Sequence, residues 1–420
     1  MTEDSTGCYT SLWNITPHSW CSRINVISQI WVATSFSQKT SSRKSKMKSN
    51  SKKNKKIGRN DLCYCGSNIK YKKCHLNRHL QPEVTEGEVK GFASKQRVAK
   101  TCFHSSVDGA NCGGKIIKAH TVSKSGSLRS IARNGKVYNF KPDINSLFKN
   151  NGKFECQEVG IGQASTFPGF CAYHDKQLFS PVEDQEFEAS VYNATLLGYR
   201  AIAREIYAKQ HQTGGISFLK MMDKGKPEFI QKELQSFAEF YEHGVDLGLQ
   251  DLLLIKALYD EAFRSKDFAP SQFVIIEFTE TPHILFSGAI YPEFDFSGNK
   301  LQDLSMAGPL DGISTNAIST TKGGAISFQW FGESSANKRF IQSLLALPEN
   351  AWANAVTQLV FEFIENLFIS PDWWDGLNPS LKQSLERRVM HILGHEQNCL
   401  VPDGSVYFIW GKPTVSKNIP

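Results

Sequence analysis

The chain has 420 residues, of which 40% are hydrophobic and 28 are Phe, and it carries a formal net charge of +7. This length suffices for two to four folded units, and the apolar content predicts a substantial core. Runs of eighteen or more consecutive apolar residues are absent from the sequence, which argues against a membrane-spanning helix, so we expect a soluble, cytoplasmic protein.

The cysteines are concentrated in one part of the chain. Seven of the ten lie between positions 63 and 171. A secreted disulfide scaffold would be short and would lack the large Phe-rich remainder, whereas clustered Cys with nearby His indicates metal binding in a reducing compartment.

Residues 1–56 are expected to form a disordered basic extension. Between Gln38 and Arg59 the sequence has ten Lys or Arg and no acid. Such a run repels itself and attracts polyanions such as nucleic acid, the ribosome or anionic lipid, although a plain solvated tail fits it equally well. These ten charges exceed the net charge of the chain, so the rest is slightly acidic and predicts no second basic groove. Met47 offers an alternative start of translation.

Residues 57–79 carry the first group of metal ligands: Cys63, Cys65, Cys74 and His75. A segment of about twenty residues cannot bury enough surface to offset its own ordering entropy. Four soft ligands in this spacing can close a tetrahedral zinc site, whose binding energy of roughly 10 to 16 kcal/mol then becomes folding energy. The sequence therefore predicts a small zinc module.

This segment resembles the SEC-C motif, the zinc-binding tail of the bacterial translocation ATPase SecA. The matching residues are Gly58, Arg59, Asn60, Asp61, Cys63, Cys65, Gly66, Ser67, Tyr71, Lys72, Cys74 and His75. Leu62 and Tyr64 stand where the motif usually has Pro, and Asn68 replaces a common Gly, which leaves every ligand intact. The resemblance implies a module that docks a protein partner or the ribosome.

The resemblance does not extend to the motor of SecA. The segment "GANCGGKI" at 109–116 has the glycines and the Lys of a phosphate-binding loop, but Ile116 stands where magnesium binding needs a hydroxyl. We therefore expect no ATPase of that type.

After a polar linker predicted at 80–98, residues 99–180 carry a second group of ligands. Cys171 and His174 form one half-site, and Cys102 and Cys112 supply the other, with His104 as a spare candidate. This pattern predicts a second zinc site.

The order of these residues resembles a degenerate HNH, or treble-clef, module. In that family a short strand ends in a His that acts as general base, here His120, and a metal ligand follows the last zinc ligand, here Asp175. The resemblance implies magnesium-dependent cleavage of DNA or RNA. The middle Asn of the family is not identifiable, with Asn139 and Asn145 as candidates. Alternatively the zinc site is purely structural. An exposed His120 within reach of Asp175 favours the enzyme, and a buried imidazole facing a carbonyl favours the structural alternative.

Residues 181–268 are predicted to be helical. The apolar spacing predicts one long helix over 181–210 and two further helices over 227–241 and 249–263.

Residues 269–420 predict an α+β domain with a mainly antiparallel sheet. Two strands are expected to pair around Thr281 and Pro282, and Ile326, Phe328 and Trp330 alternate with polar residues as in a half-buried strand. Helices return after residue 350. His391 and His395 have a helical spacing that can hold a metal, but two His alone are usually incidental.

The sequence thus predicts an α+β multidomain protein with two small zinc modules, a helical region and an α+β domain. Two functions follow. The first is a zinc-binding adaptor that docks a protein or ribosomal partner. The alternative is a metal-dependent nuclease of the HNH type that acts on DNA or RNA, for which defence is one candidate role.

Overall fold

The computed structural model describes residues 57–95, 98–140, 155–304, 308–389 and 398–419. The predicted basic extension, Met47, Asn145, His391 and His395 lie outside these residues.

An antiparallel sheet of eight strands forms the centre of the fold, in the order β10-β5-β8-β7-β6-β9-β2-β3. Every pairing in this sheet is antiparallel. The expected α+β class with an antiparallel sheet is therefore confirmed. In chain order the strands are β2 (Lys136–Asn139), β3 (Gln157–Gly160), β5 (Ser271–Phe278), β6 (Ile284–Ile290), β7 (Ile313–Thr320), β8 (Gly323–Phe331), β9 (Leu367–Ile369) and β10 (Thr414–Lys417).

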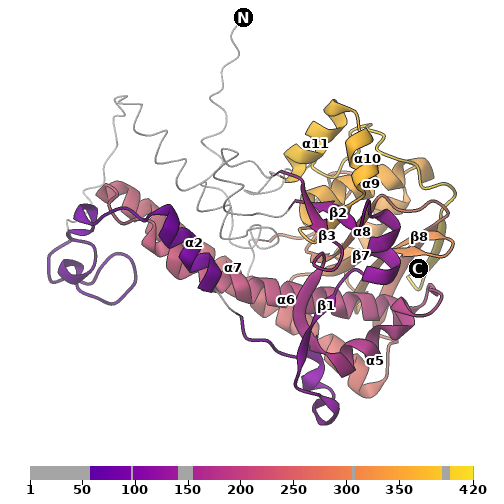
Figure 1. Ribbon diagram of the computed structural model, residues 1–420, viewed down its shortest axis with the longest axis horizontal. Helices are drawn as coiled ribbons and strands as arrows, with labels where there is room; N and C mark the ends of the chain where they lie inside the picture. Colours follow the sequence, from indigo (N-terminus) through magenta and orange to yellow (C-terminus); the bar gives the residue numbers. More distant parts are fainter. Residues whose placement is uncertain (1–56, 96–97, 141–154, 305–307, 390–397, 420) are drawn as a thin grey trace, which may run out of the picture.

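Helices cover both faces of this sheet. Phe273 and Ile275 of β5 pack with α6 (Val191–Met221), while Val274 and Ile276 belong to the core that includes α8 (Ser335–Leu345) and α9 (Glu349–Phe363). Successive side chains of a strand point to opposite faces, so a strand covered on both sides has a continuous apolar run. Helices α10 (Pro371–Gly376) and α11 (Pro379–Val389) lie beside the α9 layer (Figure 1).

Two expectations about this sheet are wrong. β5 and β6 do not pair with each other, because β5 lies between β10 and β8, and β6 between β7 and β9. β8 is buried on both faces, since its polar residues Ser327 and Gln329 are only 2% and 1% exposed. Those polar side chains lie under the helices, where we expected solvent.

The helical region consists of a long hairpin of two helices. α7 (Glu228–Ser265) is a single helix of 38 residues where the sequence predicted two, and α6 begins at Val191 after α5 (Ala172–Glu183) has ended. At 1.5 Å per residue α7 is about 57 Å long. The hairpin extends from the sheet, and residues 57–80 lie at its far end (Figure 1).

The segment predicted as a polar linker contains helix α2 (Glu86–Lys95). Val89 of this helix is 2% exposed and packs with Phe218 and Leu219 of α6. The prediction of an unstructured tether is therefore wrong for residues 86–95. They form a helix that packs against the hairpin in a small hydrophobic core.

The segment predicted as the second zinc module is divided between two parts of the fold. β1 (Ile116–His120) pairs with β4 (Thr166–Cys171) in a separate two-stranded sheet, whereas β2 and β3 extend the eight-stranded sheet. Leu128 and Val137 belong to the main core. Residues 99–180 therefore share a core with residues 269–420.

Candidate metal centres

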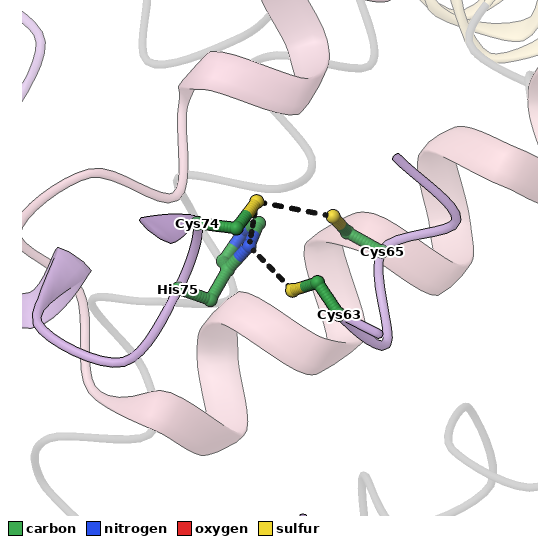
Figure 2. Close-up of side chains that lie close together, drawn as sticks. All are labelled: Cys63, Cys65, Cys74 and His75. Carbon is green, nitrogen blue, oxygen red and sulfur yellow. Dashed lines mark hydrogen bonds between the residues drawn. The ribbon is translucent and has the colours of Figure 1, made fainter. Parts of the chain in front are cut away.

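The structure brings Cys63, Cys65, Cys74 and His75 together, with ligand atoms all within 4.8 Å of one another. His75 Nδ1 lies 3.1 Å from Cys63 Sγ and 3.1 Å from Cys74 Sγ, and the Sγ atoms of Cys65 and Cys74 are 3.5 Å apart (Figure 2). Tetrahedral zinc with bonds of about 2.0–2.3 Å has ligand–ligand distances of roughly 3.5–3.8 Å. The cluster therefore has the size and donor set of a metal site.

A tight loop between the ligands sets this geometry. The amide of Cys63 donates to Ile69 O at 2.8 Å, and Gly66 and Asn68 adopt left-handed φ values of 69° and 57°. Gly and Asn tolerate this region better than other residues. The Asn at 68, in place of the common Gly, is thus compatible with the turn that the thiols need.

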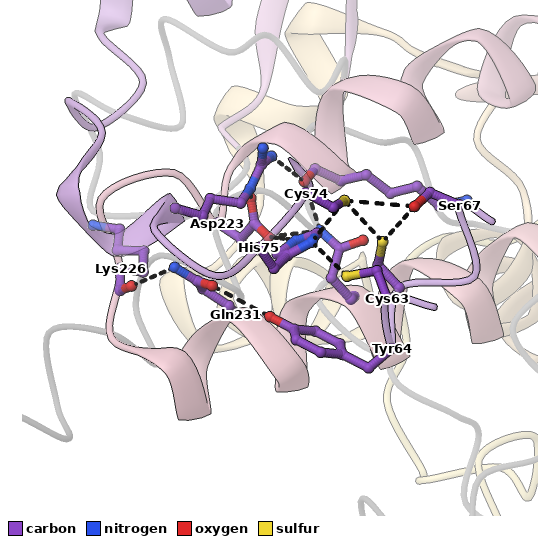
Figure 3. Close-up of polar contacts among 12 residues, drawn as sticks. Cys63, Tyr64, Ser67, Cys74, His75, Asp223, Lys226 and Gln231 are labelled. Carbon is purple, nitrogen blue, oxygen red and sulfur yellow. Dashed lines mark hydrogen bonds and ion pairs between the residues drawn. The ribbon is translucent and has the colours of Figure 1, made fainter. Parts of the chain in front are cut away.

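The outer nitrogen of His75 is held by a residue that sequence analysis missed. With Nδ1 facing the thiols, Nε2 donates to Asp223 Oδ2 at 2.7 Å (Figure 3). Asp223 is fully buried and also accepts from Arg78 Nε at 2.5 Å and Gln235 Nε2 at 2.8 Å. A carboxylate behind a ligating His fixes the ring orientation and raises its basicity as a ligand.

Asp223 lies in the turn between α6 and α7, so the first cluster is attached to the tip of the hairpin. Tyr64 adds a second attachment, because its hydroxyl donates to Gln231 Oε1 at 3.2 Å and its ring lies 4.9 Å from that of His75 (Figure 3). The Tyr in place of the usual Pro at position 64 therefore connects this module to α7.

The second cluster contains Cys102, Cys112, Cys171 and His174, whose ligand atoms also lie within 4.8 Å of one another. His174 Nδ1 lies 3.3 Å from Cys102 Sγ and 3.4 Å from Cys171 Sγ. The spare candidate His104 is not in this set, since its Nδ1 faces the Tyr199 hydroxyl at 3.3 Å. The described residues thus contain two groups that could hold a metal ion, each made of three Cys and one His.

The second cluster is more deeply buried than the first. Cys171 is fully buried, and its sulfur caps α5 by accepting from the amide of His174 at 3.4 Å. Cys102 and Cys171 pack in a core with Phe170 and Phe179. Behind His174, Asp108 Oδ2 lies 3.6 Å from Nε2, which is an electrostatic contact beyond hydrogen-bond range. This carboxylate comes from the same segment as the ligands, whereas Asp223 comes from the hairpin.

Burial disfavours the thiolate form of one cysteine in each cluster. It raises the pKa of Cys63 to about 12 and that of Cys102 to about 11. A divalent cation binds thiolates and releases their protons, so it would stabilise the charged form that burial disfavours. The eight cysteines of the described residues are free thiols.

The two predicted catalytic residues, His120 and Asp175, are not hydrogen-bonded to each other in the described part of the chain. His120 ends β1, and its Nε2 donates to Ile161 O at 3.2 Å. Asp175 is in the first turn of α5, and its Oδ1 is buried without a hydrogen-bond partner. Burial lowers the pKa of His120 and raises that of Asp175, and the Glu183–Arg200 ion pair acts on both.

Comparison with protein families identifies one motif. Residues 59–77 match the SEC-C motif, which includes all four ligands of the first cluster. Comparison with the curated proteins found no match, and comparison with the solved structures found none either. The family match covers a small part of the chain, and the expected HNH-like module has no support from these comparisons.

The helices of the described residues are too short or too polar to span a membrane. Even α6 and α7, the two longest, lack an apolar stretch that could cross a bilayer.

Proposed function

We propose that this chain is a zinc-binding adaptor of the cytoplasm that docks a protein or ribosomal partner through its SEC-C module. In this proposal each Cys3His cluster holds one Zn²⁺, through Cys63, Cys65, Cys74 and His75 and through Cys102, Cys112, Cys171 and His174. Three thiols and an imidazole are the donors that structural zinc prefers, and a closed set of four leaves no position for substrate. The free thiols support a reducing compartment.

The observation that carries the proposal is the surface of the first module. Leu62 and Ile69, which flank the thiol loop, are 63% and 47% exposed. Lys70, Lys72 and Lys73 are exposed beside them. Apolar side chains rimmed by charge mark interaction sites, and the positive charge suits an acidic partner surface. The basic run that precedes this module would add attraction to nucleic acid or the ribosome.

The hairpin supports the same function. Tyr199, which packs with Cys102 and Cys171, and Met221, the last residue of α6, are 22 positions apart in this helix, or about 33 Å at 1.5 Å per residue. The first module therefore lies away from the sheet (Figure 1), and the contacts of His75 with Asp223 and of Tyr64 with Gln231 hold it against the hairpin.

Site-specific photo-crosslinking tests the docking. A benzoylphenylalanine at position 62 should yield a discrete adduct with a protein or ribosomal partner in cells. The same probe at position 409, where Ile409 is 71% exposed, is the control and should yield none. The adduct should be lost when Cys74→Ser removes a ligand of the first cluster. Absence of an adduct from position 62, or equal adducts from both positions, contradicts the proposal.

A second candidate is the metal-dependent nuclease. Its support is that β1 ends at His120, that α5 begins after Cys171, and that the Glu183–Arg200 pair, with a 2.7 Å contact, influences both His120 and Asp175. A bound Mg²⁺ at Asp175 would supply charge neutralisation for phosphate cleavage. The contact of His120 with Ile161 O instead favours the structural alternative, so we rank this function second.

A nuclease assay separates the two candidates. With magnesium or manganese, the unmodified chain should cleave DNA or RNA and His120→Ala should lose roughly 100-fold or more of that rate if His120 is the general base. His243→Ala, at an exposed position of α7, is the control. An inactive parent chain, or equal rates for His120→Ala and the parent, rejects the nuclease.

A further inference from the structure

The two metal clusters differ in how far their thiols are exposed to solvent. In the first cluster Cys65 and Cys74 are both partly exposed. In the second cluster Cys102 and Cys171 are 3% and 0% exposed, and Cys112 is the thiol there that is partly exposed. The oxidation of a thiol depends on its exposure. A dissolved oxidant therefore has access to a pair of thiols in the first cluster and to a single thiol in the second.

The exposed pair of the first cluster is also close together. The Sγ atoms of Cys65 and Cys74 are 3.5 Å apart, about 1.5 Å more than the length of a covalent S–S bond (Figure 2). The Ser67 hydroxyl lies 3.2 Å from Cys65 Sγ and 3.5 Å from Cys74 Sγ, where it can donate to either thiolate. The loop between the two thiols passes through Gly66 and Asn68, which are exposed. This loop can therefore close the gap between the sulfurs without moving a packed core.

The second cluster lacks this freedom to move. Cys102 and Cys171 pack in a core with Phe170 and Phe179, and Cys171 Sγ accepts from the amide of His174 at 3.4 Å at the start of α5. A disulfide that includes either sulfur has to shift it within close-packed surroundings, and strain makes such a bond more easily reduced. We therefore expect an oxidant to act on the first cluster and to spare the second.

We propose that Cys65 and Cys74 form a reversible disulfide when the chain meets a hydroperoxide, and that this reaction releases the zinc of the first cluster and ends docking by the SEC-C module. The inference rests on the proposed docking function, whose regulation it names. Cys63 and His75 are the donors of this cluster that remain after the reaction, and structural zinc needs four. The second cluster keeps its zinc, so the sheet and its helices stay folded while docking is lost.

The reaction consumes one hydroperoxide for each disulfide. The Cys65 thiolate attacks the terminal oxygen of the O–O bond, which breaks to give a sulfenic acid at Cys65 and an oxyanion that takes a proton. The Cys74 thiolate then attacks the sulfenic sulfur, the S–S bond forms, and hydroxide leaves and takes a second proton. The two sulfurs together lose two electrons, which the peroxide gains. A dithiol reductant returns two electrons through a mixed disulfide and restores both ligands.

Zinc release from the full, zinc-loaded chain tests this chemistry. A few equivalents of hydrogen peroxide should release about one zinc ion per chain to a chromophoric chelator, and a dithiol with added zinc should restore it. Trypsin and chymotrypsin together separate Cys63 from Cys65, because Tyr64 lies between them, so mass spectrometry should locate the disulfide between Cys65 and Cys74. Release without this disulfide, equal release from both clusters, or no release in about a hundredfold excess of peroxide overturns the proposal.

A matched pair of variants assigns the effect to Cys65. Cys65→His keeps four zinc donors, as a Cys2His2 set, but cannot form the disulfide, so peroxide should release its zinc at least about tenfold more slowly. Cys112→His makes the same change in the second cluster and should release zinc from the first at the rate of the unmodified chain. Equal rates for Cys65→His and the unmodified chain contradict the proposal. If Cys65→His binds no zinc, the disulfide map of the unmodified chain decides.

Crosslinking in cells tests the effect on docking. The adduct from benzoylphenylalanine at position 62 should fall at least about fivefold after treatment with hydrogen peroxide and return when the peroxide is removed, whereas Cys65→His should keep its adduct. An adduct that persists in chains with the Cys65–Cys74 disulfide contradicts the regulation. Absence of the adduct from untreated cells contradicts docking itself, and zinc release and disulfide mapping then decide the redox reaction alone.

Discussion

We expect the unmodified chain to bind about two zinc ions and the Cys171→Ser variant about one, and the variant should unfold at a temperature roughly 10 °C lower. Cys171 is fully buried in an aromatic core, its sulfur caps α5, and it lies among the four ligands of the second cluster. Loss of the metal leaves buried polar groups beside α6. A loss of about 3 kcal/mol corresponds to this shift at 2–4 °C per kcal/mol. Metal analysis and calorimetry measure the two effects.

Cys65→Ser provides the matched comparison for this prediction. Cys65 is only partly buried and lies in the first cluster, which contacts the hairpin tip and not the sheet. This variant should also lose about one zinc ion, but the main unfolding transition should move by less than about 2 °C. If Cys171→Ser retains both zinc ions, or if the two variants shift the main transition equally, the second cluster does not stabilise the core as we infer.

Asp223→Asn should weaken zinc binding at the first cluster by about 10- to 100-fold. The carboxylate accepts from His75 Nε2 at 2.7 Å, and the amide that replaces it is a weaker acceptor and orients the imidazole less firmly. The change also leaves Arg78 without its ion-pair partner, so residues 57–80 should become more sensitive to proteolysis. A competition titration with a chromophoric chelator measures the affinity, and limited proteolysis followed by mass spectrometry locates the cleavage.

The control for Asp223→Asn is Asp246→Asn, which makes the same chemical change at an exposed position of α7. Zinc affinity and protease sensitivity should match those of the unmodified chain. Full zinc affinity in Asp223→Asn would falsify the role of this carboxylate in holding His75.

The ligand sets were predictable because metal chemistry leaves a local trace in sequence. Cys63, Cys65, Cys74 and His75 are adjacent along the chain, and the SEC-C match at 59–77 includes them all. The second set spans a longer insert, yet the Cys and His spacing still indicated the four residues that the structure brings together. The preference of thiols and imidazoles for a common cation made these residues recognisable before their positions were known.

The packing around the clusters was not predictable in the same way. Asp223 is 148 positions from His75, in a turn between two helices, and no spacing rule connects them. The prediction of an unstructured linker was wrong because the burial of Val89 depends on α6, which lies far along the chain. The polar residues of β8 were expected in solvent for the same reason, since only the helix laid over them buries Gln329.

The chemistry of this protein can be read from neighbouring residues alone: which residues can bind a cation, the absence of a long apolar run, and the α+β class that the periodicity implies. How those residues are supported depends on contacts between distant segments: Asp223 lies behind His75, His120 contacts Ile161 O, and helices bury the polar side chains of β8. The physical reason is that ligand type and local periodicity are properties of neighbouring residues. Burial and hydrogen bonding between distant segments depend on how the whole chain packs.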